Sequence, residues 1–195
     1  RMRHLVGLAK IDPTVDMASE FLDSTDRKLV IFVHHIDVHT ILLRKLTEVC
    51  SELGIEAPIS LTSDLNSDKR DQLIRQFQDD SERRIVVAST LAFGEGISFY
   101  PCSDCIIMER QWNPANEEQA EARFIRVDQK TESINTTDSV AVGTIDEYLA
   151  DIVERKRAIV AQTIDKKEMV WQESEIIREL AERLAREGRK RWKIS

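Results

Sequence analysis

The sequence is poor in the residues that mark disordered, collagen-like or disulfide-stabilised chains. Its 195 residues include only six Gly, four Pro and three Cys. So little Gly and Pro excludes a collagen-like or low-complexity chain. An odd, small number of cysteines favours a reducing compartment, which is the cytoplasm, or the nucleus in a eukaryote, over secretion. We therefore expect a globular protein that is not secreted.

Long apolar runs and a net positive charge are also missing. No run approaches the roughly 18 residues of a membrane span, and the first residues lack the apolar core of a secretory signal. We expect no membrane partner, and the start on Arg1-Met2 indicates part of a longer protein. The net charge of −7 provides no bulk basic field for nucleic acid, although a local patch can act alone. The basic end REGRKRWKIS is such a patch, and a solvated helix end is its favoured interpretation.

Five short apolar, β-branched runs are present, and helical patterns separate them. The richest runs are apolar throughout, as expected of strands that are covered on both faces. Strands that alternate with helices predict βαβ units and an α/β fold with a parallel sheet. The predicted strands are residues 29–33, 59–61, 84–88, 104–108 and 138–142, and the predicted helices are 37–53, 67–77 and 116–126.

Capping residues support two of these helices. Gly54 follows the first helix as a plausible C-cap, and Ser67 starts the second as a capping residue. Ligands of parallel sheets bind outside the carboxyl ends of the strands. The loops after residues 33, 61, 88, 108 and 142 are therefore the predicted location of the functional site.

The last quarter of the chain has a purely helical pattern. Apolar residues recur at helical spacing from Thr144 onward, and a second amphipathic helix is predicted over 174–187, with Gly188 after it. We expect a core domain over 1–143 and a C-terminal helical extension over 144–195. The extension could pack back on the domain, brace a neighbouring domain or bind a partner helix, and packing on the domain is the default expectation.

Cysteine and histidine pairs give only weak signals for a metal site. Cys102 and Cys105 have a zinc-like spacing, but no second pair follows, and Cys105 is expected to begin a buried strand. His35 and His39 are four residues apart, with no carboxylate-rich partner set nearby in the sequence. We predict structural histidines and no metal site.

Two loops at the predicted carboxyl edge carry groups that bind phosphate. The third strand runs into Ser89 and Thr90 and then into Gly94-Glu95-Gly96. Hydroxyls and unhindered glycine amides at a strand end can contact phosphate oxygens, although G-x-G alone is a weak signal.

The segment QWNPANEEQAEARFIRVDQK places an amide and two guanidiniums on one helix face. Gln119, Arg123 and Arg126 follow the spacing i, i+4, i+7. Periodicity alone leaves two interpretations open, a solvated polar face or a pair of cations that bind a phosphate.

The order of five segments resembles the second RecA-like lobe of Swi/Snf-type DNA translocases, which belong to helicase superfamily two. The segments are LVIFVHH, ISLTSDLNSDKRDQLIRQFQ, ASTLAFGEGISF, QWNPANEEQAEARFIRVDQ and GTIDEYLADIVERK. The resemblance covers residues 5–162, and WNPANEEQA followed by R-x-x-R-x-x-Q is its most specific part. FVHH and Glu109 look more like the branch that contains annealing-helicase-type remodellers.

This resemblance implies a fold, an activity and partners. The fold is a RecA-like three-layer α/β sandwich with a mostly parallel sheet and C-terminal helices. The activity is that of an ATP-dependent helicase or double-stranded DNA translocase of the chromatin-remodelling and DNA-repair type. In the family two lobes close over ATP and Mg²⁺, and the first lobe carries the phosphate loop and the acidic magnesium motif, neither of which occurs here. The chain is then half of a composite site, inactive alone, and its partners are an N-terminal RecA-like lobe of the same chain and double-stranded DNA.

The resemblance also implies roles for individual residues. Arg126 matches the arginine finger, which stabilises charge on the transferring phosphoryl group, and Arg123 matches its companion. The residues that match the nucleotide cleft are Gly94, Glu95, Gly96 and Gln119. The residues that match the DNA-tracking surface are Thr62, Ser63, Arg70, Ser89, Thr90 and Trp112.

Three positions depart from the family pattern. Phe93 replaces a glycine, Ser98 replaces an asparagine, and Asp128 replaces a glycine and puts a carboxylate near the finger. These departures keep an alternative open, a degenerate lobe that docks DNA or a protein without ATPase function. A stand-alone α/β binding protein is a third possibility.

Overall fold

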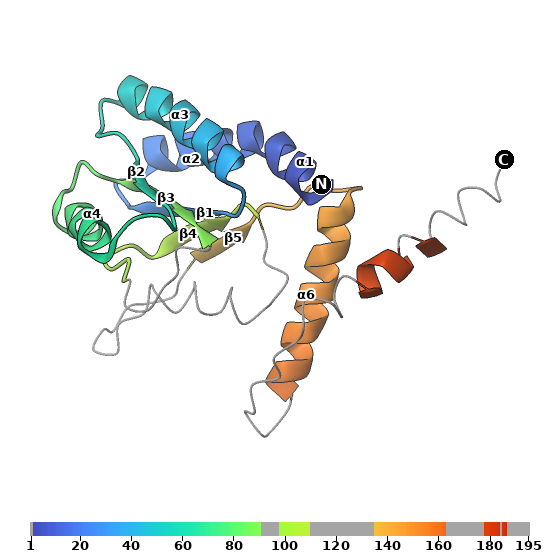
Figure 1. Ribbon diagram of the computed structural model, residues 1–195. Helices are drawn as coiled ribbons and strands as arrows, with labels where there is room; N and C mark the ends of the chain where they lie inside the picture. The colour runs from blue at the N-terminus through green and yellow to red at the C-terminus, as the bar shows by residue number, and fades with distance from the viewer. Residues whose placement is uncertain (1, 91–97, 110–134, 163–177, 184, 187–195) are drawn as a thin grey trace.

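A computed structural model shows the architecture of the protein. It describes residues 2–90, 98–109, 135–162, 178–183 and 185–186 (Figure 1). Within helix α6 only the backbone is described beyond residue 155.

A five-stranded parallel sheet forms the centre of the molecule. Its strand order is β2-β3-β1-β4-β5, and each of the four strand pairs is parallel. The strands are β1 (Leu29–Val33), β2 (Ile59–Leu61), β3 (Ile85–Ser89), β4 (Asp104–Ile107) and β5 (Asn135–Asp138). The predicted fold class is confirmed, and the first four predicted strands agree with the structure to within one residue.

The prediction for the fifth strand was wrong. The strand was expected at 138–142, but β5 is Asn135–Asp138. This strand is polar and exposed, and among the described strands it lies at the sheet edge and pairs with β4 alone. The apolar residues that suggested a strand follow it, and Val142, with 82% of its surface exposed, lies just before a turn in which Gly143 has a φ of 76°. Backbone pairing, and not burial of side chains, decides where this edge strand runs.

Helices cover both faces of the sheet. Figure 1 shows α1, α2 and α3 on one face and α4 on the other. The helices are α1 (Met2–Ala9), α2 (Ile11–Ser24), α3 (Ile36–Leu53), α4 (Ser67–Asp79) and α6 (Ile145–Gln162). The sequence analysis did not predict α1 and α2, whereas α3 and α4 occupy the predicted ranges with small extensions.

The caps of α3 and α4 explain where these helices begin and end. Gly54 adopts the left-handed conformation with a φ of 70°, so the predicted C-cap of α3 is confirmed. The N-cap of α4 is Asn66 and not Ser67, because Asn66 Oδ1 accepts a hydrogen bond of 2.8 Å from the backbone N–H of Lys69. Ser67 is the first helical residue.

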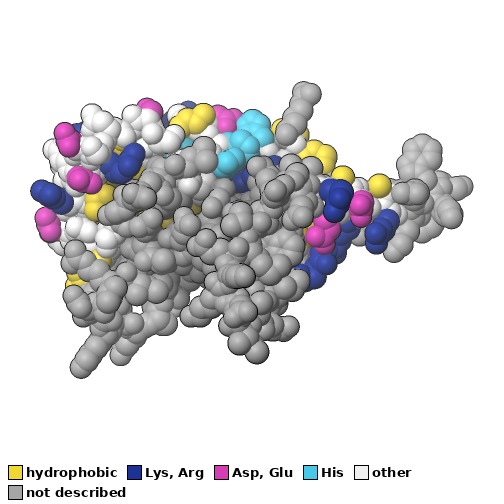
Figure 2. Space-filling view, turned by 60° about the horizontal axis from the view of Figure 1, so that its bottom comes forward, with side chains coloured by type: hydrophobic (Ala, Val, Ile, Leu, Met, Phe, Trp, Pro, Cys, Tyr) yellow, Lys and Arg dark blue, Asp and Glu magenta, His cyan; other side chains and the backbone are white. Residues whose placement is uncertain are grey.

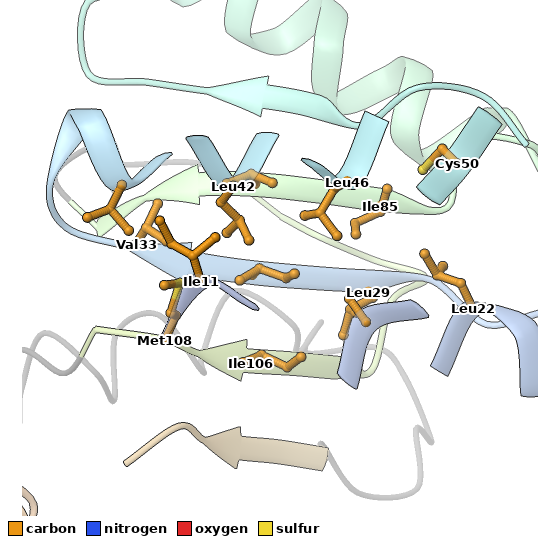
Figure 3. Close-up of a cluster of buried hydrophobic side chains, with 14 residues drawn as sticks. Ile11, Leu22, Leu29, Val33, Leu42, Leu46, Cys50, Ile85, Ile106 and Met108 are labelled. Carbon is orange, nitrogen blue, oxygen red and sulfur yellow. The ribbon is translucent and has the colours of Figure 1, made fainter. Parts of the chain in front are cut away.

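Side chains of the strands alternate between two apolar clusters, one on each face of the sheet. In β1, Leu29, Ile31 and Val33 join the cluster under α2 and α3 (Figure 3). Val30 and Phe32 point to the opposite cluster, which includes residues of α4. Two covered faces explain why β1 is apolar at every position.

Two basic side chains fix the amino-terminal edge of the sheet. Lys28 Nζ donates to the carbonyl oxygens of Phe77, Asp80 and Arg83, and burial lowers the pKa of Lys28 despite the nearby Asp80 carboxylate. Arg84 Nη2 donates to the carbonyl oxygens of Leu22 and Thr25 at the end of α2. Both contacts satisfy helix-terminal carbonyls that have no partner within the helix.

The C-terminal helices form a small apolar cluster of their own. Leu180, in the helical segment 178–183, packs with Leu149, Ile152 and Val153 of α6. Arg155 and Glu179 add an ion pair of 2.8 Å between the two helices. The described part of the predicted 174–187 helix thus packs on α6, and α6 contacts α1. Among the described residues, no helix is both long enough and apolar enough to cross a membrane.

Candidate functional site

The carboxyl ends of the parallel strands bring polar residues to one edge of the sheet. Leu61 of β2 is in register with Ala88 of β3, and Val33 of β1 with Ser89. The residues that follow these strands are therefore neighbours, and they are Thr62 and Ser63 after β2, Thr90 after β3, and His34 and His35 after β1. Glu109 follows β4 at the same edge, which is the place where parallel sheets bind ligands.

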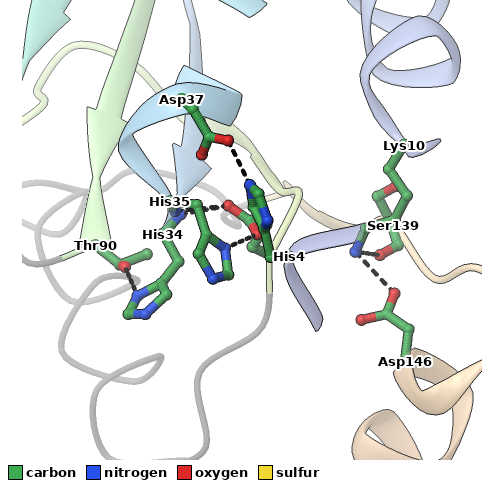
Figure 4. Close-up of polar contacts among 9 residues, drawn as sticks. His4, Lys10, His34, His35, Asp37, Thr90, Ser139 and Asp146 are labelled. Atoms are coloured by element: carbon green, nitrogen blue, oxygen red, sulfur yellow. Dashed lines mark hydrogen bonds and ion pairs between the residues drawn. The ribbon is translucent and has the colours of Figure 1, made fainter. Parts of the chain in front are cut away.

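His34 connects the ends of β1 and β3. Its Nδ1 lies 3.3 Å from Thr90 Oγ1, as Figure 4 shows. Burial lowers the pKa of His34, and the Arg3 and His35 charges act in the same direction. This shift favours the neutral ring, which has one donor nitrogen and one acceptor nitrogen.

Glu109 holds the turn between β1 and α3. Its side chain is only 2% exposed, and its Oε2 accepts hydrogen bonds from the backbone N–H groups of His34 (2.7 Å) and His35 (2.9 Å). Its Oε1 lies 2.6 Å from His35 Nδ1. Three donors compensate the cost of burying the carboxylate. Glu109 is 74 residues from His35 in the sequence and adjacent to it in space.

Helix α1 covers this turn from the outside. His4 Nε2 pairs with Asp37 Oδ2, and the His4 ring lies 5.0 Å from the His35 ring, centroid to centroid (Figure 4). The hydrogen bond from His4 lowers the pKa of Asp37. In the space-filling view of Figure 2, histidine side chains gather at the surface beside acidic and hydrophobic side chains.

The loop after β2 folds back on its own backbone. Arg70 Nη2 donates to Leu65 O at 3.0 Å, and the hydrogen bond from Thr62 lowers the pKa of the exposed Asp64. Ser63 is exposed and Thr62 is partly exposed. Arg70 therefore stabilises the conformation of the loop in which Thr62 and Ser63 lie at the carboxyl edge.

The structure places five of the predicted site residues. Thr62, Ser63 and Thr90 lie together at the carboxyl edge, Arg70 is in the first turns of α4, and Ser89 is the last residue of β3, with 7% of its surface exposed. The other predicted residues lie outside the described part of the chain, together with Phe93, Asp128 and the predicted helix 116–126. They are Gly94, Glu95, Gly96, Trp112, Gln119, Arg123 and Arg126.

The cysteines and His39 have structural contacts. Burial raises the pKa of Cys102 to about 12 and of Cys50 to about 11, and Cys102 Sγ donates to Lys28 O at 3.0 Å. His39 is buried in α3, where Nε2 lies 3.1 Å from Val87 O. Cys105 is the second residue of β4 and is buried. Within the described residues, no three His, Cys, Asp or Glu side chains form a group that could hold a metal ion.

Sequence reasoning missed the network of His34, His35 and Glu109 as a unit. The signal was available, because each of these polar residues follows a buried strand within two residues. It also missed Lys10, whose Nζ lies 2.7 Å from Asp146 Oδ2 and 3.0 Å from Ser139 O (Figure 4). No sequence pattern connects residues 136 positions apart.

Comparisons with known proteins agree with this geometry. The pattern of the helicase conserved C-terminal domain matches residues 11–128. The Mus musculus protein "DNA annealing helicase and endonuclease ZRANB3" is 28% identical over 178 residues, which are 90% of this chain and 16% of that protein. This chain therefore spans only a small part of the length of that relative.

Solved structures show the same fold. The C-terminal part of the Fun30 ATPase domain superposes with a TM-score of 0.65 at 24% identity, over 91% of this chain and 54% of that chain. The Sulfolobus solfataricus SWI2/SNF2 ATPase core in complex with dsDNA superposes with a TM-score of 0.59 at 26% identity, over 80% of this chain and 31% of that chain.

A parallel five-stranded sheet with helices on both faces and a polar carboxyl edge is the architecture of the RecA-like α/β class. The chain belongs to the helicase conserved C-terminal domain family, as the second RecA-like lobe of the Swi/Snf-type branch of helicase superfamily two.

Proposed function

We propose that this chain is the C-terminal motor lobe of an ATP-dependent double-stranded DNA translocase or remodeller that acts in DNA repair or chromatin metabolism. The observation that carries the proposal is the polar carboxyl edge formed by Thr62, Ser63 and Thr90, within a chain of the helicase C-terminal domain family. The likeness to a SWI2/SNF2 core that was solved with dsDNA supports duplex DNA as the partner. The three free, buried cysteines suit a reducing compartment, the nucleus or the cytoplasm.

ATP hydrolysis in this proposal needs a second lobe. The sequence contains neither the phosphate loop nor the acidic magnesium motif of the family's first lobe, so ATP and Mg²⁺ are assigned mainly to an N-terminal RecA-like lobe of the same protein. Mg²⁺ there would neutralise charge that develops on the phosphates. This chain supplies Arg126 as the arginine finger, with Arg123 beside it. The residues assigned to the nucleotide cleft are Gly94, Glu95, Gly96 and Gln119.

DNA is held through its phosphates. Thr62, Ser63, Arg70, Ser89, Thr90 and Trp112 are assigned to the tracking strand. Thr90 is a better candidate than the buried Ser89, because its side chain is partly exposed. Contacts of this type carry no sequence information, so we expect strong salt dependence and weak sequence preference.

The composite site is tested by comparing the full-length protein with this chain alone. We expect the full-length protein to hydrolyse ATP faster when double-stranded DNA is added, and this chain alone to show no turnover. Full-length protein that binds duplex DNA without hydrolysing ATP would instead support a degenerate docking lobe. Tight nucleotide binding by this chain alone would indicate a stand-alone binding protein.

A further inference from the structure

Glu109 occupies the junction of three elements at the carboxyl edge. It follows β4, it accepts the two backbone N–H groups of the turn between β1 and α3, and it contacts the His35 ring. His34 in the same turn contacts Thr90 at the end of β3. His34 therefore links Glu109 to Thr90, through its backbone N–H on one side and its ring on the other.

Helix α1 reaches Glu109 at a glycine. A Cβ atom built on Gly7 would lie 2.5 Å from Glu109 Oε1 and 3.3 Å from Val38 Cγ2. Gly7 is inside a helix, where alanine is favoured over glycine by about 1 kcal/mol. The close approach of α1 to the carboxylate explains why a glycine is present at this position.

We propose that Glu109 is a positioning residue for the DNA-tracking edge. It fixes the His34-His35 turn, and through the His34 side chain it sets the place of Thr90, while α1 determines the place of Glu109 itself. The inference rests on the proposed function, because it takes Thr90 as a DNA contact. Helix α1 is remote from Thr90 in the sequence, but under this proposal it controls the position of Thr90 through Glu109.

A buried carboxylate at the other end of the same strand provides a matched control. Asp104, the first residue of β4, accepts hydrogen bonds from Asn135 Nδ2 (3.0 Å) and Ser103 Oγ (3.1 Å) and pairs with Arg27 (2.9 Å). It is as embedded in polar contacts as Glu109, but it lies at the amino edge of the sheet. If the DNA readouts respond to lost stability alone, replacing either carboxylate changes them. If they respond to positioning of the carboxyl edge, only replacement of Glu109 changes them.

The test compares variants of the full-length protein by two readouts, the duplex DNA concentration that gives half-maximal ATPase stimulation and the Kd for a fluorescein-labelled duplex. We expect Glu109→Ala to raise both values about tenfold, because the turn loses hydrogen bonds to a charged acceptor. Turnover at saturating DNA stays within about twofold, because the proposed finger is unchanged. Asp104→Ala lowers the melting temperature and leaves both DNA readouts at the wild-type value.

Three further variants separate positioning from charge. Glu109→Gln keeps an oxygen for the two backbone N–H groups, and its amide can donate to His35 Nδ1 in the tautomer that carries the proton on Nε2, so we expect DNA readouts within about threefold of wild type. Gly7→Ala displaces Glu109 without removing it and gives a defect like that of Glu109→Ala. In the double variant Gly7→Ala with Glu109→Asp, the shorter carboxylate side chain leaves room for the added methyl group. We expect the double variant to recover part of the DNA binding that Gly7→Ala loses.

Unchanged DNA readouts in both Glu109→Ala and Gly7→Ala would overturn the positioning role. An equal defect in Asp104→Ala, or a Gln variant as poor as the Ala variant, would overturn it as well. If Glu109→Ala does not fold, Gly7→Ala and its rescue decide the question. A wild-type protein that neither binds duplex DNA nor responds to it would contradict the proposed function itself.

Discussion

At the scale of single residues, buried polar side chains determine the local geometry of this lobe. Glu109 shapes the carboxyl edge by accepting backbone N–H groups, and His39 bridges α3 to β3 through Val87 O. Each contact joins residues that are far apart in sequence, so neither could be assigned from spacing. The sequence analysis did predict His39 as structural, because no carboxylate-rich partner set stands near it in the sequence.

The buried His39 ring predicts a dependence of stability on pH. Burial lowers its pKa from 6.5, although the Val87 carbonyl and the charge of Asp64 partly oppose the shift. The folded state therefore binds fewer protons than the unfolded state, and the stability that this ring contributes is present above pH 6.5 and is lost as the pH falls through the folded pKa. We expect urea unfolding to give a lower free energy of unfolding at pH 5 than at pH 7.

The same ring can be replaced to test this cause. His39→Gln keeps a group that can hydrogen-bond to Val87 O but does not titrate. It should reduce the difference between pH 5 and pH 7, while replacement of the exposed Glu48 by Gln should not. A difference unchanged by His39→Gln would assign the pH dependence to other groups, of which His34 also has a pKa lowered by burial.

At the scale of elements, periodicity predicted the buried strands and the helices between them. Strands β1, β3 and β4 carry apolar runs, and β2 has apolar residues on both sides of Ser60, so their ranges could be predicted to within one residue. The edge strand β5 carries Asn-Thr-Thr-Asp, which has no burial signal, and its place depends on pairing with β4. Helices α1 and α2 were missed although the signal was available, because the buried Ile11, Ala18 and Leu22 of α2 recur at helical spacing.

The Lys10–Asp146 pair connects these elements and predicts an asymmetric response to mutation. The pair joins the residue between α1 and α2 to the first turn of α6, and both side chains are 5% exposed. Lys10→Met leaves Asp146 buried without its charged partner, with the backbone N–H of Ala141 still donating to it, and we expect a loss of about 3–5 kcal/mol in the free energy of unfolding. Urea denaturation checks this value.

A double variant shows whether the loss of stability comes from the unpaired charge of Asp146 or from the changed packing of the side chain at position 10. Lys10→Met with Asp146→Leu replaces both charges by apolar groups and should recover most of the stability that Lys10→Met alone loses. The exposed pair Arg155–Glu179 is a control, because surface pairs contribute about 0–1 kcal/mol. A double variant no more stable than the single one would contradict an ion pair as the cause.

At the scale of the whole molecule, the lobe has one polar edge of a parallel sheet, and we propose that this edge faces duplex DNA and a second RecA-like lobe. The order of the motifs identified the family, which the helicase C-terminal domain match then confirmed. The roles of Arg123 and Arg126 rest on that order alone, because both lie outside the described residues. The described edge residues Thr62, Ser63 and Thr90 do lie together, as the strand order requires.

The central claim is that this lobe completes an ATPase site with an arginine finger. The most direct measurement is DNA-stimulated ATP hydrolysis by the full-length protein with and without Arg126→Ala. We predict a fall in turnover of about 10³-fold or more, with duplex DNA binding retained and with Arg44→Ala, at an exposed position of α3, equal to wild type. Unchanged turnover in Arg126→Ala would contradict the account.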